Sequence, residues 1–148
     1  MWKIATCWAQ IAPGLTPLVA ALAVFVAWSQ LRSNRVNQRE TTAKGAFREY
    51  LKLAFDKQEF ANPDYAALKA DPNKLDQYHW FLAYLLWTCE EVLSYTKDDK
   101  IWRANLFANL NQHRAFFRDR PDFVRDGANL FYEQHVVDLV DDVVKDTA

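Results

Sequence analysis

The sequence predicts an all-α protein in which one N-terminal transmembrane helix continues into an antiparallel helical bundle on the cytosolic side. Three observations lead to this prediction. Residues 4–31 include no charged side chain, whereas charged residues are frequent from Arg32 onward. Beyond Arg32, apolar residues recur every three to four positions, which is the period of a helix. No stretch alternates apolar and polar residues as a half-buried strand would.

The predicted boundary between the two parts follows Leu31. Residues 1–31 form the membrane segment, with the span itself at about 11–31, and residues 32–148 form the cytosolic domain. As a helix of about 1.5 Å per residue, the span measures roughly 31 Å, close to the ~30 Å thickness of the hydrocarbon core. The domain is long enough to bury a hydrophobic core of its own.

The start of the membrane helix is left open by the sequence. Thr16 and Pro17 are typical of an N-cap followed by the first helical position. A helix that begins at Pro17 has only a short apolar run, so residues 2–12 would have to complete the span or lie in the outer interface.

The residues that flank the span predict its orientation. Trp28 lies at the inner boundary, where an aromatic ring is favoured, and Arg32, Arg35 and Arg39 follow it. Because positively charged flanks stay in the cytoplasm, we expect the N-terminus outside and the domain inside the inner (plasma) membrane of a bacterial cell. A cleaved signal peptide is the alternative, but the long apolar run and the arginines directly after it argue against export.

The membrane helix is predicted to leave the membrane and to continue to about Lys57, with a bend at Gly45. Asn62 is then expected to cap a short helix that Pro63 begins and Lys69 ends.

The next predicted helix covers residues 72–95. Its centre, residues 78–89, is apolar nearly all round. Twelve such residues are too few for a second span, which needs about 20. We therefore expect this helix to be the buried centre of the bundle.

Two further helices complete the prediction. A polar turn at residues 97–100 offers an aspartate as a cap, and a helix follows over residues 101–118. Residues 120–122 end that helix, and the last helix covers residues 126–145. No strand is expected.

Composition excludes some classes of function. The net charge is -1, so no basic field is present to attract nucleic acid. Cys7 and Cys89 fall on opposite sides of the membrane or at different depths, which argues against a disulfide between them. Core packing and the membrane boundary account for the aromatic residues better than base stacking does.

One group of residues is a candidate site. Glu90 and Glu91 end the most apolar helix, and His113 and Arg114 lie on the next one. Because buried carboxylates need partners, we expect the four to form a buried polar network. That network is either a pocket for a ligand or for proton chemistry, or an internal ion pair that fixes the register of two helices.

No catalytic, cofactor or metal site is expected. None of the three histidines has a second histidine or a cysteine three or four residues away. The sequence also contains no Gly-x-Ser-x-Gly nucleophile motif, no P-loop and no Gly-x-Gly-x-x-Gly dinucleotide motif. The chain is therefore not predicted to be an enzyme.

The chain resembles small membrane-anchored bacterial proteins of unknown function. The residues that carry the resemblance fall within residues 47–120, in a Trp-Phe-rich helix around Trp80 that ends in Glu90-Glu91 and precedes His113. The resemblance implies a helical fold and no activity.

We therefore expect a membrane-anchored interaction or sensing module. Its partners would be the lipid bilayer and either another protein or a second copy of the chain. A signal-gated effector that perturbs the membrane on oligomerising is the first alternative, and a membrane-bound enzyme is the second.

Overall fold

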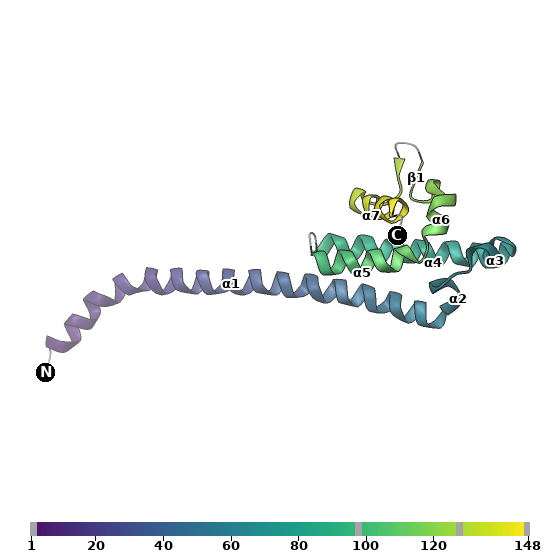
Figure 1. The fold of residues 1–148 in the computed structure, drawn as a ribbon. Helices are drawn as coiled ribbons and strands as arrows, with labels where there is room; N and C mark the ends of the chain where they lie inside the picture. Colours follow the sequence, from purple (N-terminus) through teal and green to yellow (C-terminus); the bar gives the residue numbers. More distant parts are fainter. Residues whose placement is uncertain (1–2, 97–98, 127–128, 147–148) are drawn as a thin grey trace. The chain divides into compact units, whose positions relative to one another are not determined.

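The computed structural model describes the backbone of residues 3–96, 99–126 and 129–146. The side chains of residues 3–18, 36 and 129–130 lie outside that description. The described chain is mostly helical, as predicted (Figure 1). The elements are α1 (Lys3–Asp56), α2 (Gln58–Ala61), α3 (Tyr65–Lys69), α4 (Pro72–Thr96), α5 (Lys100–Asn111), α6 (Arg114–Asp119), the 3-10 helix η1 (Pro121–Phe123), β1 (Arg125–Asp126), β2 (Asn129–Leu130) and α7 (Gln134–Lys145).

The chain divides into two compact units, residues 1–38 and residues 39–148. Helix α1 contributes to both, and the division falls seven residues beyond the boundary at Leu31 that the composition suggests. The second unit contains all the other elements and the hydrophobic core.

In the first unit, α1 begins earlier than the sequence predicted. The helix starts at Lys3 and passes through Pro13 and Pro17, so Thr16 and Pro17 are not its N-cap and first position. A proline inside a helix removes its own N–H bond and strains the preceding turn, but the remaining hydrogen bonds keep the helix continuous.

The apolar side chains of the first unit that the structure describes, from Val19 onward, are exposed. Among the residues with described side chains, no helix has an apolar stretch long enough to cross a membrane. The predicted span at 11–31 falls partly on residues 11–18, whose side chains lie outside the described part.

In the second unit, α4 is the central helix. It packs against α3, α5 and α7, and its Phe81 ring lies 5.9 Å from the ring of Tyr50 in α1. Helices α4 and α5 are antiparallel, because a turn joins Thr96 to Asp99 while Tyr78, near the other end of α4, bonds to His113 beyond α5. The buried residues of α4, among them Leu82, Leu85 and Cys89, lie on one side of the helix.

Aspartate side chains cap three helices of this unit. Asp64 accepts from the N–H of Ala67 at the start of α3, and Asp99 accepts from the N–H of Ile101 at the start of α5. Asp71 does the same for α4. The predicted aspartate cap of α5 is confirmed, whereas the predicted Asn62 cap is wrong because Asn62 follows α2 and α3 begins two residues after Pro63.

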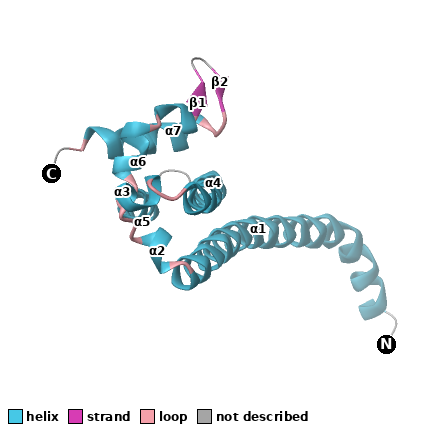
Figure 2. Ribbon diagram, turned by 90° about the vertical axis from the view of Figure 1, so that its right-hand side faces the viewer, coloured by secondary structure: helices cyan, strands magenta, loops and turns pink. Residues whose placement is uncertain are grey.

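Two predicted helices are shorter than expected. The helix predicted over 101–118 breaks at His113, whose φ of -104° and ψ of 11° end the helical ladder between α5 and α6. The last helix begins at Gln134 rather than at 126, because β1 and β2 pair as a small antiparallel hairpin (Figure 2). The prediction that no strand would form is therefore wrong. Arg125 in β1 binds Asp141 of α7 through its two terminal guanidinium nitrogens, Nη1 and Nη2, a long-range contact that local periodicity does not encode.

Candidate functional site

The first of the four residues predicted to form a network, Glu90, contacts the beginning of α7. Its Oε1 atom accepts a hydrogen bond of 2.8 Å from the backbone N–H of Glu133, the residue that precedes the helix. A carboxylate at this end also faces the positive pole of the helix dipole. Glu90 therefore satisfies a backbone donor that the helix itself leaves without a partner.

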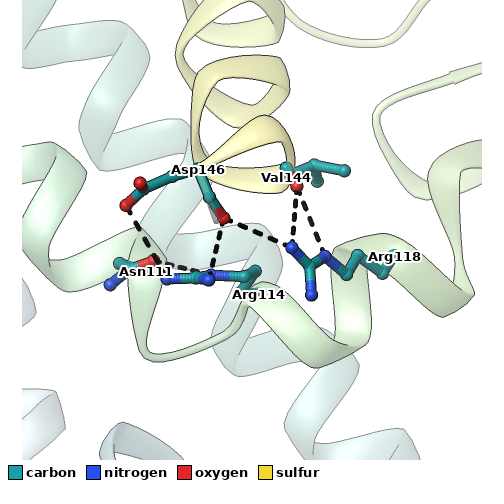
Figure 3. A network of polar contacts seen from close by, with 5 residues as sticks. All are labelled: Asn111, Arg114, Arg118, Val144 and Asp146. Carbon is teal, nitrogen blue, oxygen red and sulfur yellow. Dashed lines mark hydrogen bonds and ion pairs between the residues drawn. The ribbon is translucent and has the colours of Figure 1, made fainter. Parts of the chain in front are cut away.

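Arg114 contacts the opposite end of α7. Its Nη1 atom donates to the backbone carbonyl of Asp146 at 2.9 Å, and its Nε atom donates to Oδ1 of Asn111 at 3.0 Å. Arg118, one turn further along α6, donates to the carbonyl of Val144 at 3.1 Å (Figure 3). Two guanidinium groups thus satisfy carbonyls at the negative pole of the helix.

These contacts separate the predicted partners. Helix α7 has 12 residues and is about 18 Å long, so Glu90 and Arg114 act at opposite ends of it. The Glu91 carboxylate is partly exposed and forms no salt bridge within the described residues. The structure therefore does not bring Glu90, Glu91, His113 and Arg114 into one network.

His113 is the most buried of the four, with 1% of its surface exposed. Its Nδ1 atom lies 2.9 Å from the hydroxyl of Tyr78. Burial raises the pKa of Tyr78, so its hydroxyl keeps its proton, and burial lowers the pKa of His113 to about 4. We assign Tyr78 as the donor to a neutral imidazole, because the other tautomer leaves two buried polar groups without partners instead of one.

A pocket of about 480 Å³ opens beside this pair. It is lined by Pro63, Asp64, Tyr65, Ala66, Lys69, Tyr78, Gln112, His113, Ala115, Phe116 and Asp119. At its rim, Asp119 accepts from the Tyr65 hydroxyl at 2.7 Å and from the Lys69 ammonium at 2.8 Å. These two hydrogen bonds hold the pKa of Asp119 below its usual range, while desolvation and Asp119 raise the pKa of Tyr65 to about 12.

The chemistry available in this pocket is limited. The Nε2 atom of His113 is buried, so it cannot act as a base toward a molecule in the pocket. The Lys69 and Asp119 charges already neutralise each other. Burial raises the pKa of the Cys89 thiol, which makes that cysteine a poor nucleophile. Among the described residues, no three histidine, cysteine or acidic side chains gather as a metal site.

The structure reveals one exposed surface that the sequence analysis assigned to the core. Trp80 and Trp87 of α4 are 73% and 53% exposed, and the ring of Tyr84 lies 6.0 Å from the ring of Trp87. The expectation that residues 78–89 are buried all round is therefore wrong on this face. The spacing of these residues at i, i+4 and i+7 is the sequence signal that marks a single face.

The predicted membrane-flanking residues are all exposed. Trp28, Arg32, Arg35 and Arg39 follow one another at helical spacing along α1. The guanidinium carbon of Arg32 lies 5.8 Å from the centroid of the Trp28 ring, within the range of a cation–π contact.

No family model, curated protein or solved structure matches the chain. The resemblance over residues 47–120 therefore stays a prediction. The function has to be inferred from the residues themselves.

Proposed function

We propose that the chain is a membrane-anchored interaction or sensing module whose first unit is held in lipid. The observation that carries this proposal is the exposure of apolar side chains around α1 in a segment without charge. The exposed fractions of the large ones are Val19 65%, Leu22 66%, Val24 68%, Phe25 64%, Val26 45%, Trp28 57% and Leu31 57%. Such a surface is unfavourable in water and favourable in hydrocarbon.

The ends of this segment support the same function. Residues 4–31 carry no charge, and Arg32 and Arg35 follow directly. Trp28 and Arg32 form the aromatic and cationic pair that favours the boundary between lipid and water. The arginine flank supports a cytoplasmic second unit and an N-terminus outside the cell.

An interaction role suits the second unit better than catalysis does. The pocket beside Tyr78 and His113 holds neither an activated nucleophile nor an exposed base, because His113 is buried and Lys69 is paired. By contrast, Trp80 and Trp87 expose large aromatic rings of the type that dominates protein interfaces. Attachment to a membrane raises the effective concentration of such a surface for partners at the same membrane.

A substitution inside the segment tests the anchor. We expect the full chain to stay with bacterial membranes through carbonate extraction. Val24→Arg places a charge near the middle of the span at a cost of about 2.5–3.5 kcal/mol on the insertion scale, and it should move much of the chain to the extract. Gln30→Arg adds the same charge at the boundary and is the matched control, which should remain bound. Complete extraction of the unchanged chain would exclude the anchor.

A reporter fused after Ala148 tests the orientation. We expect a fluorescent protein that folds only in the cytoplasm to be active there, and alkaline phosphatase at the same position to be inactive. The reverse pattern would overturn the proposed orientation while leaving the anchor in place.

A further inference from the structure

Two stripes of opposite charge lie on the second unit, and most of their side chains are exposed, although Tyr84 and Glu91 are half-buried. The first stripe is on α4, and we call it the acidic stripe. Its members recur at intervals of four, four, three and four residues, so they share one helix face. They are Asp76, Trp80, Tyr84, Trp87 and Glu91. It includes no basic residue, and within the described part of the chain neither of its two carboxylates forms a salt bridge.

The second stripe lies on α1, and we call it the basic stripe. It consists of Lys44, Arg48, Leu51 and Phe55. Leu51 and Phe55 are 47% and 73% exposed. Lys44 pairs with Glu40, but both side chains are more than half exposed, so that pair is weak and exchangeable. Arg48 forms no salt bridge with any described residue.

Within one molecule, the acidic stripe and the basic stripe lie on different faces and do not pair with each other. Helices α1 and α4 pack through Tyr50 and Phe81, and the two stripes occupy other faces, as their exposure demonstrates. An aromatic face bordered by carboxylates is complementary to a face that combines cations with apolar side chains, through cation–π contacts and charge pairing. Each copy of the chain therefore has two complementary surfaces that a second copy could contact.

The packing within the unit also sets the heights of the two stripes. Helices α1 and α4 are antiparallel, since Tyr50 contacts Phe81 while Phe60, which follows α1, contacts Tyr78 (Figure 1). In an antiparallel pair, a residue before Tyr50 lies at the same height as the residue equally far after Phe81. Lys44 is six residues before Tyr50 and Trp87 is six residues after Phe81, so these two residues lie at the same height along the helices.

Leu51 follows Tyr50 and Trp80 precedes Phe81, so Leu51 and Trp80 also lie at the same height. Two copies whose second units lie side by side with parallel α4 helices would therefore present the two stripes to each other in register. Lys44 of one copy would meet the Trp87 ring and the Glu91 carboxylate of the next.

We propose that the acidic stripe receives the basic stripe of a second copy, so that the chain associates head to tail in the plane of the membrane. This inference rests on the proposed anchor, which holds the copies in one membrane. The contact is heterologous, because it joins two different surfaces. Such a contact extends into rows, or into rings where the rotation closes.

Energy transfer between copies tests the contact. The full chain, fused after Ala148 to a donor or an acceptor fluorescent protein, is reconstituted in phosphatidylcholine vesicles. Trp80→Ala combined with Trp87→Ala should weaken association by about tenfold or more, because exposed tryptophans dominate such interfaces. Both side chains are exposed, so the fold should remain intact.

A charge exchange tests the register. Lys44→Glu and Glu91→Lys should each weaken association by roughly three- to tenfold, and the two together should restore it to within about twofold. Lys100→Glu, outside both stripes, is the matched control and should have no effect. Energy transfer that none of these variants changes, or a double variant weaker than either single one, would overturn the proposal.

Flotation of the same vesicles reports the anchor separately. Chains that float with the vesicles but show no energy transfer above that of randomly placed molecules would exclude self-association and leave the anchor intact. Chains that fail to float would exclude the anchor and with it the shared membrane in which the copies meet.

Discussion

The hydrogen bond between Tyr78 and His113 places a titratable group inside the core. The imidazole is surrounded by aromatic rings, including that of Phe81 at 5.9 Å, and only 1% of the residue is exposed. A charged imidazole would lose its hydration there, which is why burial lowers its pKa. The residue ties α4 to the break between α5 and α6, so its protonation bears on the stability of the whole unit.

The pKa of His113 predicts how stability depends on pH. In the folded chain the pKa is about 4, below its unfolded value of 6.5. Between these values the unfolded chain binds a proton that the folded chain does not, so stability is complete above pH 6.5 and falls toward pH 4. The loss should reach about 3 kcal/mol. Urea unfolding of the full chain in detergent micelles across this range measures it.

A variant separates this effect from other groups that titrate nearby. The pKa of His79 is also lowered by desolvation and by Arg120, so it contributes in the same direction. His113→Asn keeps an acceptor for the Tyr78 hydroxyl but cannot be protonated. A stability curve for this variant as steep as that of the unchanged chain would show that His113 is not the group responsible.

At the scale of the element, α7 is held by other helices at both ends. Its inner face is a stripe of buried residues, Val136, Val137, Leu139, Val140 and Val143. Its first turn is bound by Glu90 of α4, and its last carbonyls are bound by Arg114 and Arg118 of α6. The Glu133 side chain forms no capping hydrogen bond at the first end, and at the last end the Asp146 N–H satisfies only the carbonyl of Asp142. The helix therefore depends on tertiary contacts to satisfy its ends.

Two neighbouring glutamates give a direct test of this dependence. Glu90→Ala removes the acceptor for the Glu133 N–H and should cost about 1 kcal/mol, with faster hydrogen exchange in the first turn of α7. Glu91→Ala removes a partly exposed carboxylate with no described salt bridge and should cost less than about 0.5 kcal/mol. Hydrogen-exchange mass spectrometry of the full chain compares the two. Equal effects would contradict the capping role of Glu90.

At the scale of the whole molecule, the two units differ in what stabilises them. Every buried residue among those with described side chains belongs to the second unit, from Ala43 onward. The described side chains of the first unit, from Val19 onward, are exposed and none of them belongs to the core. The folding of the second unit therefore depends on its own core, whereas the stability of the first unit depends on its surroundings.

A truncated chain tests this separation. Residues 39–148 contain the core and should fold without residues 1–38, with helical circular dichroism and cooperative thermal unfolding. We expect a melting temperature within about 5 °C of that of the same unit in the full chain, which corresponds to about 1 kcal/mol. A broad, non-cooperative transition would mean that residues 1–38 contribute to the core after all.

The sequence by itself determined the properties that depend on neighbouring residues. Helical periodicity and the Asp99 cap of α5 are local, and they predicted the all-α class and most helices. The charge-free segment is equally local, and the boundary that it places after Leu31 stays a prediction. The spacing of Trp80 and Trp87 is equally local, but it did not predict that both are exposed. A helix that is apolar on all sides does not reveal which side packs against other helices.

Only the tertiary structure decided which distant residues meet. The need of a buried charge for an opposite charge predicts a contact between Glu90 and Arg114, yet each satisfies backbone groups at a different end of α7. The hairpin of β1 and β2 and the break at His113 likewise depend on contacts with Asp141 and Tyr78 from other elements. The free energy of such contacts depends on how whole helices pack, and the spacing of residues along one helix carries no information about that arrangement.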